Sequence, residues 1–137
     1  MEIRSAGHLL DEVDRDDIEA LLERGHNVFL EPGDLIFDAG DKADSMYVVI
    51  EGEAQVDVGG RFHRFTRGTV FGEMALVAPG KRIAAVRAVE PLHVLKVYAD
   101  DFRSLLLDRP QIALWTLRTL ALRLREVEER IDAWMAS

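Results

Sequence analysis

The 137-residue sequence has no cysteine, only four prolines and no long uncharged apolar run. The lack of cysteine excludes disulfide bonds and thiolate metal sites. A membrane-spanning helix needs about 18 or more consecutive apolar residues, so we expect no segment to cross a membrane. Residues 1–5 also lack the apolar core of a secretory signal peptide. These absences predict a cytoplasmic protein with no membrane partner.

Basic residues are scarce as well. There are 17 lysines and arginines against 25 aspartates and glutamates, which gives a formal net charge of −8. Binding to a nucleic-acid backbone depends on clustered basic residues, so a general role of that kind is disfavoured. The four histidines are scattered, and none forms a His-x-His or other metal pattern. With no nucleophile–base pair either, we expect no catalytic residue, no metal site and no enzyme activity.

The length fits one domain, and its residue pattern changes twice along the chain. Residues 1–26 form a helical lead, in which residues 8–24 are predicted to be helical with a turn and a new N-cap near residues 14–17. Residues 27–98 contain short apolar runs separated by glycine and proline, which predicts seven or eight short strands in a small sandwich or barrel. Residues 99–137 return to helical periodicity, so the fold class is mainly β with flanking helices.

The C-terminal part is predicted to form a short helix over residues 100–107 and a long helix over residues 111–135, with a break before Pro110. The long helix carries a heptad seam, with Leu117, Leu124 and Ile131 at a and Ala113, Leu120, Val127 and Trp134 at d. This seam can pack on its own barrel or form a two-stranded coiled coil. A second apolar line of Leu114, Trp115 and Leu122 is expected to take the barrel contact, which favours a homodimer through residues 111–135.

Residues 71–86 contain the side chains that predict a binding site. Gly72, Glu73 and Ala75 open a predicted helical turn, a Pro-Gly turn follows, and Arg82 begins an apolar strand. A helix start offers unpaired N–H groups to an anion, and the flat guanidinium of Arg82 fits phosphate oxygens. An ionised Glu73 accepts hydrogen bonds from hydroxyls, such as those of a ribose. The pattern favours a sugar-phosphate site, and an ordinary Glu–Arg pair in a surface turn is the alternative.

The same stretch resembles the phosphate-binding cassette of the cyclic nucleotide-binding domain family, which includes bacterial cAMP receptors, protein kinase A regulatory subunits and cyclic nucleotide-gated channels. The resemblance is carried by Phe71-Gly72-Glu73-Met74-Ala75-Leu76 and Arg82-Ile83-Ala84-Ala85-Val86. Upstream, Pro32-Gly33-Asp34, Ile36, Gly40 and residues 47–52 resemble the first half of the family's jelly roll. The resemblance implies a double-stranded β-helix (jelly roll) and a non-catalytic sensor of a cyclic nucleotide.

The resemblance also implies roles for single residues. Glu73 would accept from the ribose 2′-hydroxyl, Arg82 would pair with the cyclic phosphate, and backbone N–H groups around Met74 and Ala75 would add contacts. Ile83 stands where many members have serine or threonine, which tilts the preference toward cAMP and away from cGMP. The implied binding residues are Phe71, Gly72, Glu73, Met74, Ala75, Arg82, Ile83, Ala84, Arg123, Val127 and Glu128.

The three residues from the long helix depart from the family pattern. Dimeric cAMP-dependent regulators cap the adenine with hydroxyls from this helix, and residues 123–128 contain none. Glu128 is either an acceptor for the adenine amino group or an exposed acid. Arg123 resembles an arginine that faces the cassette glutamate in those regulators, and a solvated helix side chain is the alternative.

Two functions remain open from the sequence. In the first, ligand binding draws the cassette inward and the long helix repacks, which signals to an unknown effector protein. In the second, the β-roll is a ligand-free scaffold and the heptad seam is a dimerisation or protein-interaction module. No helix-turn-helix follows the long helix in this sequence, so we expect no DNA partner.

Overall fold

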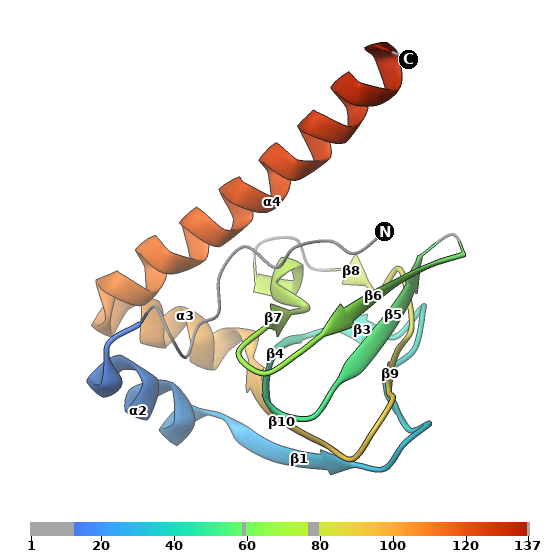
Figure 1. The fold of residues 1–137 in the computed structure, drawn as a ribbon. Helices are drawn as coiled ribbons and strands as arrows, with labels where there is room; N and C mark the ends of the chain where they lie inside the picture. The colour runs from blue at the N-terminus through green and yellow to red at the C-terminus, as the bar shows by residue number, and fades with distance from the viewer. Residues whose placement is uncertain (1–12, 59, 77–79, 137) are drawn as a thin grey trace.

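The computed structural model describes residues 13–58, 60–76 and 80–136. A helix, α2 (Arg15–Arg24), precedes the strands, and two helices, α3 (Ala99–Asp108) and α4 (Pro110–Ala136), follow them (Figure 1). The strands in the described ranges are β1 (His26–Leu30), β2 (Leu35–Phe37), β3 (Lys42–Ala43), β4 (Ser45–Glu51), β5 (Ala54–Val58), β6 (Arg61–Phe65), β7 (Val70–Phe71), β8 (Gly80–Lys81), β9 (Val86–Ala88) and β10 (Leu92–Tyr98). The predicted class, mainly β with flanking helices, is confirmed.

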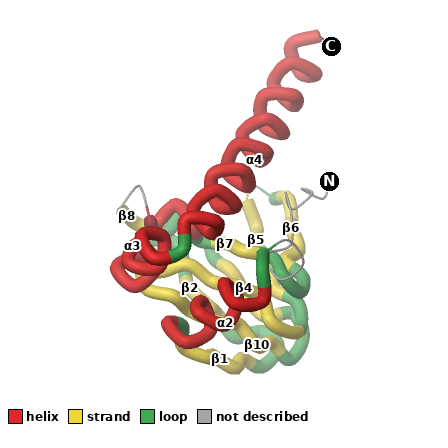
Figure 2. The backbone as a smooth tube through the Cα atoms, turned by 90° about the vertical axis from the view of Figure 1, so that its left-hand side faces the viewer, coloured by secondary structure: helices red, strands yellow, loops and turns green. Residues whose placement is uncertain are grey.

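The strands form two four-stranded antiparallel sheets, in the orders β1-β10-β4-β7 and β2-β9-β5-β6, with a small β3-β8 pair beside them. Strands that lie side by side in a sheet are mostly far apart in the sequence. This is the arrangement of a jelly roll, in which hairpins wrap around a common axis. The helices gather at one side of the roll, and α4 extends away from it (Figure 1 and Figure 2).

Strand β4 is buried on both faces and separates two cores. Side chains alternate along a strand, so Met46 and Val48 face one way while Tyr47 and Val49 face the other. The first pair packs in a core beneath the helices, which also contains Phe102 of α3 and Trp115 of α4. The second pair lies inside the roll with Phe71, Val86 and Val94. The sheet neighbour β10 does the same, with Leu95 and Val97 in the first core and Leu92 and Val94 in the second, so these two strands separate the helices from the inside of the roll.

The helical predictions are confirmed where the structure describes them. Helix α2 begins at Arg15 after the N-cap residue Asp14, and the predicted helical residues 8–12 lie outside the described part. Pro110 is the first residue of α4, where its missing N–H has no intrahelical partner to lose.

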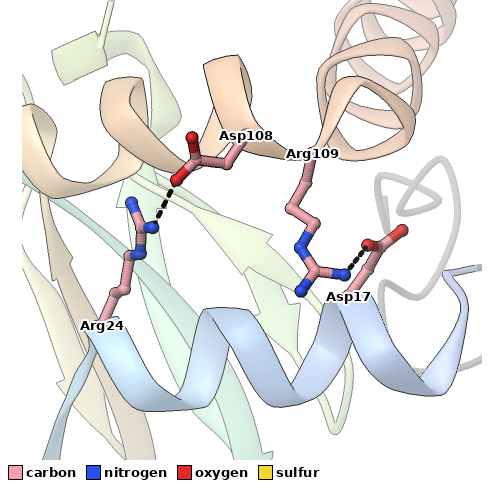
Figure 3. Close-up of polar contacts among 4 residues, drawn as sticks. All are labelled: Asp17, Arg24, Asp108 and Arg109. Atoms are coloured by element: carbon pink, nitrogen blue, oxygen red, sulfur yellow. Dashed lines mark hydrogen bonds and ion pairs between the residues drawn. The ribbon is translucent and has the colours of Figure 1, made fainter.

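Two ion pairs tie α2 to the corner between α3 and α4 (Figure 3). Arg24 Nη2 lies 2.6 Å from Asp108 Oδ2, and Arg109 Nη1 lies 3.2 Å from Asp17 Oδ1. We call these four residues the corner clamp. Helix α2 supplies the base of one pair, Arg24, and the acid of the other, Asp17. The helix can make both pairs in only one direction, so they define how it lies against the corner.

One strand boundary and part of one packing prediction are wrong. The strand expected to begin at Arg82 begins only at Val86, and the Ile83 side chain is 93% exposed. Of the line expected on the barrel, Trp115 is buried in the core beneath the helices, whereas Leu114 is exposed. The buried face of α4 in the described part consists of Ile112, Trp115 and Thr119, at helical spacings of three and four. The a positions Leu117, Leu124 and Ile131 are exposed, so they do not pack on the described part of the roll.

Candidate functional site

A cavity of about 450 Å³ opens beside η1, a 3₁₀ helix formed by Glu73–Leu76. Its volume lies in the range of small-ligand sites, about 300–1,000 Å³. All eight cassette residues predicted from the sequence line it, and the remaining wall comes from the β2-β9-β5-β6 sheet and the β3-β8 pair. The lining residues are Phe37, Ala43, Val56, Phe65, Phe71, Gly72, Glu73, Met74, Ala75, Lys81, Arg82, Ile83, Ala84 and Val86.

Arg82 is the cation of this cavity, and only 8% of its surface is exposed. Its Nη2 donates to the Ser45 carbonyl oxygen at 2.6 Å and to Ser45 Oγ at 3.3 Å. Its Nη1 donates to the Gly72 carbonyl oxygen at 3.3 Å. The guanidinium carbon lies 4.2 Å from the ring centroid of Phe37, which adds a cation–π contact. The side chain is thus held by neutral groups on three sides.

No carboxylate in the described part of the chain lies within ion-pair distance of Arg82. Its Nε is buried and has no hydrogen-bond partner among the described residues. Burial lowers the pKa of the guanidinium, while Tyr47, Asp44 and Asp41 act in the opposite direction. An arginine nevertheless stays charged at neutral pH. A buried cation without a carboxylate partner is costly, so this arrangement favours an anion in the cavity.

Backbone bonds fix the base of Arg82. Its N–H donates to the Asp41 carbonyl at 2.7 Å, and its own carbonyl accepts from the Gly40 N–H at 2.8 Å. These two bonds join the segment between β8 and β9 to the turn before β3.

Gly72 makes room for the guanidinium. Its φ is 75°, which disfavours residues with a side chain. A Cβ at this position would lie 2.8 Å from Arg82 Nη1 and 3.3 Å from the Ser45 carbonyl oxygen. The same residue accepts from the Ala75 N–H at 3.2 Å and thereby closes the first turn of η1. Glycine is therefore required here both for backbone conformation and for space.

Glu73 begins η1 and is 7% exposed, which places a carboxylate at the cavity wall. Ala75 is buried, and its N–H is used inside the turn, so a phosphate would have to compete with the Gly72 carbonyl for it. Met74 and Ile83 are exposed and line the same cavity. The cavity therefore combines a buried polar side with apolar side chains that reach the surface.

The three residues predicted from α4 are not brought to the cavity by the described part of the structure. Glu128 is exposed and is not among the lining residues. The side chains of Arg123 and Val127 lie outside the described part, as does that of Trp134. Their predicted contacts with a ligand stay predictions.

Sequence reasoning missed Ser45, Phe37 and Tyr47. Ser45 is fully buried, and its Oγ also donates to Asp44 Oδ1 at 3.0 Å. The ring of Tyr47 stacks on Phe71, with centroids 5.2 Å apart and an angle of 13° between the planes. All three precede the cassette by more than 20 residues. Strand pairing joins them to it: β4, which carries Ser45, pairs with β7 and places Tyr47 opposite Phe71, and β2 pairs with β9 and places Phe37 opposite Val86.

The described residues contain neither a metal-binding cluster nor a membrane-spanning helix. No group of three or more histidine, cysteine, aspartate or glutamate side chains is arranged to hold a metal ion. No described helix combines the length and apolar character that crossing a lipid bilayer requires.

Comparison with known proteins agrees with this geometry. The sequence model of the cyclic nucleotide-binding domain matches residues 27–109. A CRP-like cAMP-activated global transcriptional regulator of Mycobacterium tuberculosis is 27% identical over 95% of this chain, and a cyclic nucleotide-gated potassium channel of Rhizobium etli is 36% identical over 68% of it. The chain spans 61% and 26% of the lengths of these two relatives. The catabolite activator protein of Thermus thermophilus superposes with a TM-score of 0.82 at 27% identity, covering 93% of this chain and 62% of that one.

Proposed function

The chain belongs to the cyclic nucleotide-binding domain family, and we propose that its cavity beside η1 binds a cyclic mononucleotide, with cAMP preferred over cGMP. In this proposal residues 1–137 form one regulatory domain, with a helical lead (1–26), a β-roll (27–98) and C-terminal helices (99–137). The domain has no catalytic residue of its own. It senses the nucleotide and passes the signal to an effector protein.

One observation supports the proposal above all: the guanidinium of Arg82 is buried in the cavity wall and has no carboxylate partner among the residues that the structure describes. A cyclic phosphate would supply the missing anion, and charge-assisted hydrogen bonds to it are stronger than those to the carbonyls that now accept from Arg82. The orphaned Nε adds a donor for the same anion. The nearby start of η1 contributes N–H groups that have no partner within the helix.

The rest of the ligand has matching surfaces. Glu73, at the cavity wall beside Gly72, suits the ribose 2′-hydroxyl, which is a hydrogen-bond donor. Ile83 offers the base an apolar side chain and no hydroxyl, which supports adenine over guanine. The aromatic side chains Phe37, Phe65 and Phe71 provide apolar surface for the remainder of the nucleotide.

The packing of η1 suggests how the signal leaves the site. Helix η1 contacts both β4 and α3, and α3 packs against α4. If a phosphate draws Arg82 and Gly72 inward, η1 moves with Gly72 and shifts α3. The position of α3 then depends on ligand binding and in turn sets the position of α4, which couples α4 to the ligand.

Titration calorimetry of the purified chain with cAMP and cGMP tests the proposal. We expect saturable binding of cAMP, weaker binding of cGMP, and a loss of about 2–5 kcal/mol of cAMP binding free energy in Arg82→Ala. Arg103→Ala is the matched control, because Arg103 is solvent-exposed on α3 and pairs with Asp100 at 2.9 Å. Unchanged affinity in Arg82→Ala, or an equal loss in the control, would count against the cassette assignment.

A second candidate function is favoured by a separate observation. Three a positions of the α4 seam are exposed, which suits a dimerisation or protein-interaction module whose roll binds no ligand. The same calorimetry separates the two functions. If the folded wild-type chain gives no binding heat with either nucleotide, the second candidate replaces the first.

A further inference from the structure

A second cavity, of about 390 Å³, lies where β1 and β4 end and β10 begins. We call it the β1-end groove. Figure 1 and Figure 2 show this end of β1 on the opposite side of the roll from the free end of α4. Its lining residues are Phe29, Leu30, Glu31, Glu51, Gly52, Glu90, Pro91, Leu92 and His93, and none of them lines the cavity beside η1.

An exposed aromatic ring forms one side of the groove. Phe29 is 74% exposed, although its strand is part of a sheet. Its ring stacks on that of His93, with centroids 4.3 Å apart and an angle of 22° between the planes. His93 Nε2 lies 2.8 Å from Asn27 Oδ1, which fixes the orientation of the imidazole. The stack holds Phe29 in one orientation and leaves much of its ring uncovered.

The backbone around the groove is fixed before any ligand arrives. Gly52 has a φ of 94°, and a Cβ there would lie 2.3 Å from the Pro91 carbonyl oxygen. The two turns that form the floor therefore touch directly. The turn after β1 is closed by a hydrogen bond from the Glu31 N–H to Asp34 Oδ2 at 2.9 Å. A preformed groove lowers the entropic cost of binding a partner.

Three glutamates line the same groove as the aromatic ring of Phe29. Glu31, Glu51 and Glu90 line the groove, and none has an ion-pair partner in the described part of the chain. Glu53, two residues past Glu51, differs in this respect, because it pairs with Arg64 at 2.9 Å. The groove thus combines an open aromatic face, apolar residues and unpaired negative charge.

We propose that the β1-end groove docks an arginine-bearing segment of a partner protein. A guanidinium stacks flat on an aromatic ring and also forks two hydrogen bonds to a carboxylate, which matches Phe29 and its glutamate neighbours. Apolar neighbours of that arginine would cover Leu30 and Pro91. The volume exceeds what one side chain fills, which favours a peptide segment over a single small cation. This inference does not depend on nucleotide binding.

The test uses the full chain and a fluorescent peptide, acetyl-Leu-Arg-Leu-Arg-Leu-amide, followed by anisotropy at low salt. A peptide with citrulline in place of arginine keeps the shape and removes the charge. We expect saturable binding of the arginine peptide and binding weaker by about tenfold or more for the citrulline peptide. Phe29→Ala and the isosteric Glu51→Gln should each weaken the arginine peptide by about tenfold or more.

Two variants serve as matched controls on other surfaces. Phe62→Ala removes another exposed phenylalanine, on β6, and Glu23→Gln neutralises an exposed glutamate on α2. Both should bind the peptide like the wild type. Equal losses in the controls, equal binding of the citrulline peptide, or spermidine binding as tight as that of the arginine peptide would each overturn the proposal. If Phe29→Ala does not fold, Glu51→Gln still tests the groove. Titration of each variant with cAMP shows separately whether its nucleotide site is intact.

Discussion

At the scale of single residues, Gly72 and Arg82 share one small volume, and each limits what the other can be. The left-handed φ of Gly72 turns its carbonyl toward the guanidinium, which donates to it at 3.3 Å. The missing Cβ leaves the space that Nη1 occupies. Gly72 and Arg82 therefore together form the proposed anion site and determine the conformation at the start of η1.

This pairing predicts the effect of Gly72→Ala. The left-handed backbone alone should cost about 1 kcal/mol or more of unfolding free energy, and the displaced guanidinium should weaken cAMP binding by about tenfold or more. Urea unfolding and calorimetry measure the two effects. Gly80→Ala is the control, because no atom lies within 4 Å of a Cβ there, and it should change stability by less than about 0.5 kcal/mol. Equal effects of the two substitutions would contradict the role given to Gly72.

The sequence predicted the cassette residues of the cavity wall well, because glycine, acid and arginine have distinct chemistry in that pattern. It did not predict Ser45, because its shortest contact with Arg82 is through a backbone carbonyl, which nearly every residue type has. Phe37 was missed for a related reason. A phenylalanine in a short apolar run looks like core, and only the fold places its ring over a guanidinium.

At the scale of elements, the corner clamp joins the start of the fold to the helix that follows the roll. Asp17 is nearly buried, whereas Arg109 keeps 41% of its side-chain surface exposed. The α3–α4 corner is the point at which any movement of α3 would turn α4. An ion pair at this corner therefore influences how firmly α4 is held.

A double-mutant cycle with Asp17→Asn and Arg109→Gln measures this pair. We expect a coupling energy of about 0.5–1 kcal/mol by thermal or urea unfolding, reduced in high salt. The exposed Arg103–Asp100 pair on α3, one turn apart, is the matched control and should give about 0–0.5 kcal/mol. Coupling at the corner no greater than in the control would show that the clamp does not stabilise it.

Element prediction succeeded where the apolar period was long and failed where it was short. The helices and the strands of five or more residues were anticipated, but the two-residue strands β3, β7 and β8 were not. Two residues are too few to show the alternation of a strand, so such strands can be recognised only from their pairing with other strands in the fold. Leu114 was misassigned because both faces of α4 carry leucines, and the side that meets the roll is selected by Ile112 and Trp115.

At the scale of the whole molecule, α4 extends beyond the roll (Figure 2). Leu117, Leu124 and Ile131 repeat every seven residues and are exposed. Large apolar side chains in such a row gain burial when a second copy of the helix packs against them. We infer that the chain dimerises through α4.

Leu117→Glu combined with Leu124→Glu should convert this dimer to a monomer, because four carboxylates would meet across the seam. Sedimentation velocity over a range of protein concentrations measures the change. Leu107→Glu is the control, since Leu107 is also an exposed leucine but lies on α3, outside the seam. A wild-type chain that stays monomeric at high concentration would refute the dimer.

A crystal structure of the chain with cAMP would show directly whether the cavity beside η1 holds the nucleotide. We expect nucleotide density in this cavity, with a phosphate oxygen about 2.7–3.0 Å from a nitrogen of Arg82 and the Glu73 carboxylate at the ribose 2′-hydroxyl. Clear density for Arg82 still bonded to Ser45 and Gly72 in an empty cavity, at saturating cAMP, would contradict this expectation.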